Sequence, residues 1–180
     1  MEIEIIRSRR KTLALQVRPD GSLQVRAPRL LPRAAIDRFV AEQGEWIQAQ
    51  RRKLAERPPV ERLGEEELTA LKKRARPVFL AKTARFAPVV GVRYGRISVR
   101  SQRSKWGSCS AQGNLNFNCL LLLAPEEVLD YVVVHELCHL REMNHSPRFW
   151  AEVERVLPDY KDARRWLRQN GGALMARLPE

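Results

Sequence analysis

The chain has 180 residues, of which 44% are apolar and 30% are charged, and its formal net charge is +12 at pH 7. This composition is typical of a soluble protein and excludes one built mainly of membrane-spanning segments. A chain of this length forms one domain, or a core domain with a small appendage, and buries about two-thirds of its unfolded surface.

The N-terminal segment and the cysteines exclude two further classes. "MEIEIIRSRRKTLAL" interleaves charged and apolar residues and has no uninterrupted apolar stretch, so it is unlike a secretory signal, and we expect a cytoplasmic protein. Three cysteines without C-x-x-C spacing indicate neither a disulfide framework nor a cysteine zinc site.

The first sixty residues predict a small β-sheet followed by a helix. Segments 2–7, 11–18 and 22–27 alternate apolar and polar side chains, and "PDGS" between the last two is typical of a hairpin turn. The segment 31–57 has apolar residues near helical spacing until Pro58 and Pro59 end it. We expect residues 1–60 to form an N-terminal subdomain with an antiparallel sheet.

A linker and a second, α+β domain follow. Paired prolines, a glycine and dense charge in 56–67 predict a linker with a boundary near residue 62. The pattern then predicts a helix from Glu65 to about Ala87 and strands within 91–100 and 113–123. The segment 101–113 between those strands suits a loop or an irregular hairpin.

Three helices are expected after the second strand. Pro125 at the first helical position, with Glu126 and Glu127 in the first turn, predicts the start of a largely apolar, buried helix that ends at Asn144. Ser146 and Pro147 predict the N-cap and first residue of the next helix. A last helix is expected to end at Gly171.

All three histidines of the chain lie in "HELCHLREMNH", residues 135–145. Residues four apart share a helix face, so His135 and His139 can bind one metal ion. Glu136 lies beside them, where its carboxylate can take a proton from a metal-bound water. His145, beyond the expected helix end, is the remaining imidazole and the predicted third ligand.

Alternatives to this ligand set remain open. Glu152 and Glu154 could bind the metal from the following helix, or act in support of the ligands. We expect one catalytic Zn²⁺ per chain, although three histidines with an open position can bind other divalent ions. In the other interpretation, the two helix histidines are hydrogen-bonded within the protein and bind no metal. This interpretation is disfavoured, because burying His, Glu and His together in an almost wholly apolar helix is costly.

An interval without acidic residues lies between Glu67 and Glu126. It contains eleven basic residues, namely Lys72, Lys73, Arg74, Arg76, Lys82, Arg85, Arg93, Arg96, Arg100, Arg103 and Lys105. Such a surface attracts an anionic partner, for example nucleic acid, a nucleotide or an acidic protein. The alternative is a set of solvated faces in an arginine-rich protein.

The segments "WGSCS", "HELCHL", "NHSPRFW" and "LPDY…W" resemble the YgjP-like metallopeptidase family, which is related to SprT-like and other zincin peptidases. The resemblance covers residues 103 to about 167, and "RSRRKTLALQVRPDGSLQVRAP" is similar to that family's first strands. It implies a zincin-like α+β fold for residues 61–180, with a small mixed sheet packed on the metal-binding helix. It also implies zinc ligands at His135, His139 and His145, with Glu136 as the catalytic base.

The histidine spacing equals that of metzincins, but Glu142 stands where metzincins have glycine, and no Met-turn follows. Four residues are candidates for contacting substrate, namely Arg103, Lys105, Ser108 and Asn116. By analogy, the strand with Asn114, Asn116 and Asn118 could be an edge strand that binds an extended peptide by main-chain pairing.

The sequence therefore predicts a zinc-dependent hydrolase, in particular a metallopeptidase that acts on peptides or proteins. One alternative is a metal-dependent phosphohydrolase acting on nucleotides, although no phosphate-binding loop is present. Another is a nucleic-acid-associated SprT-like protease that uses the basic 72–105 region. No membrane partner is expected.

Overall fold

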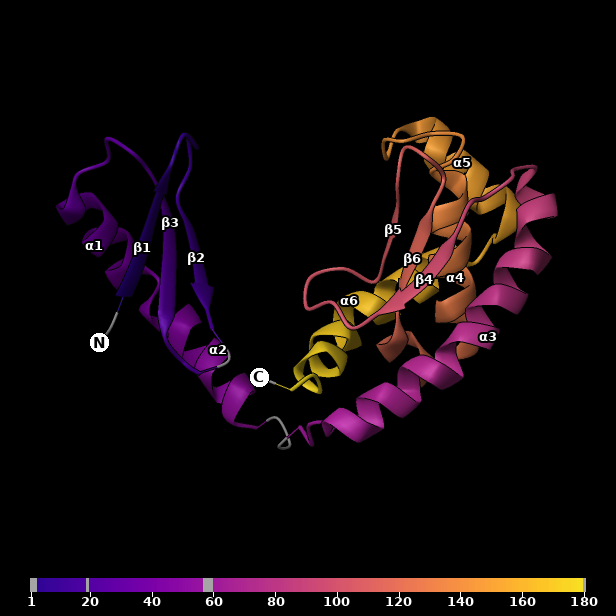
Figure 1. Cartoon of the computed structure of the whole chain (residues 1–180). Coiled ribbons are helices and arrows are strands. Elements are labelled where there is room, and N and C mark those ends of the chain that lie inside the picture. The colour runs from indigo at the N-terminus through magenta and orange to yellow at the C-terminus, as the bar shows by residue number, and fades with distance from the viewer. Residues whose placement is uncertain (1–2, 19, 57–59, 180) are drawn as a thin grey trace. The chain divides into compact units, whose positions relative to one another are not determined.

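A computed structural model of the chain describes residues 3–18, 20–56 and 60–179. The chain divides into two compact units, Met1–Pro59 and Val60–Glu180, whose elements are shown in Figure 1. Pro19, in the predicted turn, and Pro58 and Pro59, in the predicted linker, lie outside the described residues. Within the described part, each helix is too short or too polar to cross a lipid bilayer.

The N-terminal unit contains a three-stranded sheet of β1 (Ile3–Ser8), β2 (Ala14–Val17) and β3 (Leu23–Pro28), in the order β1-β3-β2. The predicted hairpin of β2 and β3 is antiparallel, and the Arg18 N–H donates to the Ser22 carbonyl at 2.9 Å to close it. β1 instead pairs with β3 in parallel. The expectation of an antiparallel sheet therefore holds for the hairpin and is wrong for β1, because alternation within a strand does not specify the direction of its partner.

Two helices, α1 (Arg33–Glu42) and α2 (Gly44–Ala55), stand where one helix was predicted. The break lies at Gln43, whose N–H donates to the Val40 carbonyl three residues back, and Gly44 follows it. Glycine is a weak helix former, so the chain can bend here at little cost. The bend allows Val40 and Ile47 to join one core with Val25 of the sheet.

The C-terminal unit begins with α3 (Glu65–Val90). The Glu67 carboxylate accepts the Gly64 N–H at 2.8 Å at the start of this helix, and Gly91, with a φ of 78°, ends it. The helix packs on a sheet of β4 (Ile97–Arg100), β5 (Gly107–Cys109) and β6 (Leu115–Asn118) in the order β4-β6-β5. Phe79 of α3 stacks on Phe117 of β6 with ring centroids 4.7 Å apart.

The sheet is mixed, since β4 is parallel and β5 antiparallel to β6. The short strand β5 lies inside the segment predicted as a loop or irregular hairpin. A short 3₁₀ helix, η1 (Cys119–Leu123), continues from β6 and leads to the helical part of the unit. The mixed sheet and helices confirm the predicted α+β fold class.

The remaining helices are α4 (Glu126–Cys138), α5 (Pro147–Val156) and α6 (Tyr160–Ala176). α4 contacts α3, α5, α6 and β5, and most of its residues are buried, as predicted (Figure 1). α6 continues past the expected end at Gly171, because this glycine packs against the Trp106 ring, where an added Cβ would lie 3.0 Å from a ring carbon.

The end of α4 was predicted six residues too late. The helix ends at Cys138, and the N–H groups of Leu140 and Arg141 donate to carbonyls only three residues back. These tighter turns take the chain off the helix axis directly after His139. Local propensity did not reveal this, because Leu140 to Met143 are all good helix formers.

Candidate metal centre

Three imidazoles converge at the C-terminal end of α4. One ring nitrogen from each of His135, His139 and His145 can be chosen such that the three atoms lie within 4.8 Å of one another. The Nε2 atoms of His135 and His145 are 3.0 Å apart. Two nitrogens bound to one tetrahedral zinc lie roughly 3.3 Å apart, so the spacing suits a shared metal ion.

The backbone after α4 explains how His145 returns to the helix. The Ser146 N–H donates to the Asn144 carbonyl at 2.8 Å, which forms a tight turn. The Ser146 hydroxyl accepts the Phe149 N–H at 3.3 Å and so caps α5, with Pro147 as the first helical residue. The predicted N-cap is therefore confirmed, and it fixes the point at which the His145 loop joins α5.

Two contacts lie behind the histidines, and one of them assigns the tautomer of its ring. The Nδ1 atom of His139 lies 3.1 Å from the Glu142 carbonyl, which can only accept, so Nδ1 carries the proton and Nε2 is free. The Tyr131 hydroxyl lies 3.5 Å from Nδ1 of His135. Such outer contacts orient a metal-binding imidazole and fix its tautomer.

Aromatic rings surround the histidines on the side of α5 and α6. The Phe149 ring centroid lies 4.6 to 4.9 Å from the centroids of all three imidazoles. Trp150 stacks on His145 at 5.6 Å, and Tyr160 stacks on Trp150 at 5.4 Å. The Arg164 guanidinium covers the Trp150 ring at 4.4 Å. This stack holds the exposed His145 against the two helix histidines.

Glu136 is 5% exposed and lies beneath β5. A Cβ atom on Gly107 would lie 2.5 Å from its Oε1 atom, so only glycine allows the strand to pass this close. Burial raises the pKa of Glu136 to about 8, and the nearby Lys105 ammonium opposes the shift. Burial, with the neighbouring imidazoles, lowers the pKa of His135 to about 3, which keeps it in the neutral form that binds metals.

A cleft of about 260 Å³ opens beside these groups. Tyr131, Val132 and Leu167 give it apolar walls, and His135, Glu136 and Lys105 are its ionisable members. A few polar and ionisable groups within a cleft of apolar walls are typical of an active site.

A family model described as "YgjP-like, metallopeptidase domain" matches residues 11–71 and 65–170 of the chain. The chain belongs to the YgjP-like metallopeptidase family. The resemblance found in the sequence is thereby confirmed, and the enzyme is a metal-dependent hydrolase of the metallopeptidase class.

Two solved structures are similar to part of this YgjP-like chain. The metallopeptidase zymogen abylysin of Pyrococcus abyssi is 24% identical, with a TM-score of 0.46 over 51% of this chain and 93% of that one. The metallopeptidase zymogen jannalysin of Methanocaldococcus jannaschii is 19% identical, with a TM-score of 0.46 over 51% and 95%. No curated protein matches the chain.

The asparagine strand of the YgjP-like unit is not at the sheet edge, contrary to expectation. β6 lies between β4 and β5, so β5 is the edge strand next to Glu136. Asn116 pairs in register with Ser108 of β5, and its Oδ1 atom is buried without a hydrogen-bond partner among the described residues. Asn116 therefore does not lie on an edge strand to which an extended peptide could pair.

Asn118 instead holds the loop that precedes β5. Its side-chain amide donates to the carbonyls of Gln102 at 2.7 Å and Lys105 at 3.0 Å, and its oxygen accepts the Leu120 N–H. This asparagine is only 2% exposed. The loop carries the side chain of Lys105 to the cleft, whereas the Arg103 guanidinium donates to the Pro179 carbonyl.

The two alternative carboxylates lie in ion pairs. Glu152 pairs with Arg155 at 3.0 Å and lies 3.7 Å from Arg141, and Glu154 pairs with Lys161 at 2.8 Å. Neither joins the histidines in the group of metal-ligating side chains found among the described residues.

The sequence did not predict a role for Tyr131, Trp150 or Arg164. Only Tyr131 had a signal, because it lies four residues before His135 and so shares a helix face with it.

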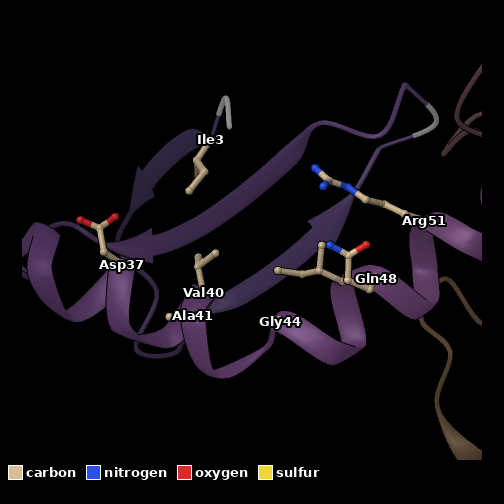
Figure 2. A pocket seen from close by; sticks show the side chains of 8 residues that line it. Ile3, Asp37, Val40, Ala41, Gly44, Gln48 and Arg51 are labelled. Carbon is tan, nitrogen blue, oxygen red and sulfur yellow. The ribbon is translucent and has the colours of Figure 1, made fainter.

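The N-terminal unit has a hollow of its own, shown in Figure 2, of about 260 Å³. Ile3 of β1, Val40 of α1 and Gln48 of α2 line it. Its lining contains no histidine or cysteine, and its single acidic residue, Asp37, pairs with Arg33 at 2.9 Å. This hollow therefore offers no metal-ligating cluster.

Replacing Asn118 with alanine is expected to lower the free energy of unfolding of the C-terminal unit by about 2–3 kcal/mol, because two carbonyls and one N–H lose their buried partner. Urea unfolding followed by tryptophan fluorescence measures this. A Trp46→Phe background removes the tryptophan of the N-terminal unit, so that the signal reports the other unit.

Asn116→Ala is the matched control, since Asn116 lies in the same strand and its oxygen has no partner to lose. Its cost is expected to stay below about 1 kcal/mol. Equal losses for the two variants would show that the amide of Asn118 does not hold the loop.

Proposed function

We propose that this chain is a zinc-dependent peptidase in which His135, His139 and His145 bind one zinc ion and Glu136 is the general base. The observation that carries the proposal is the convergence of the three imidazoles beside a buried carboxylate. We also assign the catalytic centre to residues 61–180, and treat residues 1–60 as a separate subdomain.

The donor set suits zinc in chemistry as well as in spacing. Neutral imidazole nitrogens are preferred zinc ligands, and three protein ligands with one open position are typical of catalytic zinc. The proton on Nδ1 of His139 leaves its Nε2 available, and the depressed pKa of His135 keeps that ring neutral. Zinc, when bound, supplies a water of pKa about 7 and a Lewis acid for the peptide carbonyl.

The chain's own residues perform the proton transfers. Glu136 accepts a proton from the attacking water and later donates it to the departing amine. Burial beneath β5 holds this carboxylate in one place beside the histidines, so that the same group can serve both steps. The apolar walls of Tyr131, Val132 and Leu167 limit the access of bulk water to the carboxylate.

The substrate is placed along β5. This strand pairs with β6 on one side only, so its other edge can pair with an extended peptide. Gly107 brings the strand against Glu136, which would set the peptide bond close to the base. Of the four predicted contacts, Lys105 lines the cleft and Ser108 lies in β5, whereas Arg103 and Asn116 are assigned no contact.

The peptidase is favoured over the phosphohydrolase for a structural reason. Among the described residues, the three histidines are the one group of three or more side chains that could hold a metal. A phosphohydrolase with a pair of metal ions needs further carboxylates near them. Glu152 and Glu154, the two carboxylates on α5, are held by basic side chains.

His145→Ala is expected to reduce the zinc content from about one ion per chain to well below half, because two ligands bind zinc far more weakly than three. Elemental mass spectrometry on protein purified without a metal column measures this. Glu152→Gln is the matched control and is expected to keep its zinc. Loss of zinc in the control, with retention in His145→Ala, would assign the third ligand to the carboxylate.

Glu136→Gln is expected to lower peptide hydrolysis by at least about 100-fold while zinc content is unchanged, because the amide cannot accept the proton. The rate is measured by mass spectrometry on a pool of synthetic decapeptides. Glu127→Gln, at the exposed start of α4, is the control and is expected to be fully active. A fully active Glu136→Gln variant would remove Glu136 from the mechanism.

Trp150→Ala is expected to raise the dissociation constant for zinc by about tenfold or more, because His145 loses the ring that orients it. Competition with a chelating dye measures the constant. Trp150→Phe keeps an aromatic face and is expected to recover most of the affinity, and Trp46→Ala, in the other unit, should have none of this effect. Unchanged affinity in Trp150→Ala would show that the stack does not position the ligand.

A further inference from the structure

Lys105 lines the cleft beside Glu136, and the proposed proton transfers do not use it. Lys105 and Glu136 are the charged lining residues of this cleft, and they differ sharply in exposure. Glu136 is buried beneath Gly107, whereas the Lys105 side chain is exposed at the cleft. Within residues 3–18, 20–56 and 60–179, no carboxylate forms an ion pair with Lys105.

The backbone of Lys105 is fixed, whereas its ammonium group is exposed and acts on Glu136 only through its charge. The buried Asn118 amide binds the Lys105 carbonyl at 3.0 Å, and the next residue, Trp106, accepts the Asn118 N–H at 2.8 Å. The loop therefore presents a cation at a defined place, next to the strand proposed to bind the substrate. An exposed lysine with an ordered backbone and no partner is well suited to pair with a ligand anion.

A second exposed cation, Arg164, lies near the histidines. Arg164 of α6 covers the Trp150 ring at 4.4 Å, and its charge acts on both Tyr131 and His135. In the part of the chain that the structure describes, Arg164 also forms no ion pair. Nearby carboxylates are already paired with other cations, Asp162 with Arg165 at 2.8 Å and Glu154 with Lys161 at 2.8 Å.

The positive charge around Lys105 follows from the interval between Glu67 and Glu126, which contains no acidic residue. This interval includes the loop that carries Lys105, the whole of β5 and the other two strands of the sheet, β6 and β4. A peptide bound along β5 would therefore meet cations and no exposed carboxylate from these elements. Carboxylates beside an anion-binding lysine would weaken its binding of an anion. Their absence from these elements favours an anionic substrate.

We propose that this enzyme selects acidic polypeptide segments, with a substrate carboxylate close to the scissile bond pairing with Lys105 and a second one reaching Arg164. This inference rests on the proposed peptidase function, whose substrate class it names. Polypeptide is favoured over nucleic acid because Lys105 lies in a small cleft with apolar walls, whereas a phosphate backbone needs a continuous basic track.

The test uses decapeptides that are identical except for Glu, Gln or Lys at the positions flanking the cleaved bond, with kcat/KM measured for each. The wild-type enzyme is expected to prefer the Glu series over the Lys series by about tenfold. Lys105→Gln should remove most of this preference, and Lys105→Glu should reverse it. Arg100→Gln, which removes an exposed cation from the opposite edge of the sheet, should keep the wild-type preference.

Two outcomes of the rate measurement would overturn the proposal. One is a wild-type enzyme that cleaves the three series equally. The other is a Lys105→Gln variant that slows on all three series by the same factor, which would give Lys105 a part in the chemistry and none in selection. Since Lys105 is exposed, its variants are expected to fold, and circular dichroism checks this.

A binding measurement separates this inference from the peptidase assignment. The zinc-loaded Glu136→Gln variant is mixed with fluorescein-labelled Glu-rich or Lys-rich decapeptides, and fluorescence anisotropy is recorded. Tighter binding of the Glu-rich peptide, lost in Glu136→Gln with Lys105→Gln, supports acidic selection even if the wild-type protein cleaves no peptide. Equal binding, no binding, or tighter binding of a single-stranded 20-mer DNA than of the Glu-rich peptide would overturn it.

Discussion

The burial of α4 is the constraint on which the rest of the C-terminal unit depends. Nine residues of this helix are buried, and one of them is Glu136. Burying an ionisable side chain costs free energy unless the group is paired, binds a metal or becomes neutral. α3, α5, α6 and β5 all contact α4, so the helix is held on several sides while its C-terminal end opens to the cleft.

The early end of α4 brings His145 back to the two histidines of the helix. His135 and His139 lie one turn apart, but a helix that continued to Asn144 would carry His145 away from them. The 3₁₀-type turns at Leu140 and Arg141 redirect the chain, and the Ser146 cap starts α5 at the right place. Phe149 and Trp150 of α5 then pack against the imidazoles, so the element that follows the third histidine also supports it.

The parts of this architecture that depend on local chemistry were predictable from the sequence. The start of α3 at Glu65, the cap at Ser146, the start of α4 and the shared face of His135 and His139 follow from side-chain types and spacing. The direction of β1 and the pairing of β5 depend on which strand each one meets, which the alternation within a strand does not encode. The break at Gln43 had a local signal in Gly44, which the helical spacing of the apolar residues on both sides of it concealed. No local pattern encodes the position of Arg164 over Trp150, which arises only when α5 and α6 pack together.

Gly107 links the chemistry of the site to its electrostatics. Because it lacks a side chain, β5 lies directly on Glu136 and shields this carboxylate from solvent. The burial raises the pKa of Glu136. Lys105, which is two residues before Gly107, keeps its ammonium group exposed. A larger residue in place of Gly107 would push the strand outward and admit water between the strand and Glu136. One glycine therefore allows a buried carboxylate and an exposed cation to line the same cleft of about 260 Å³.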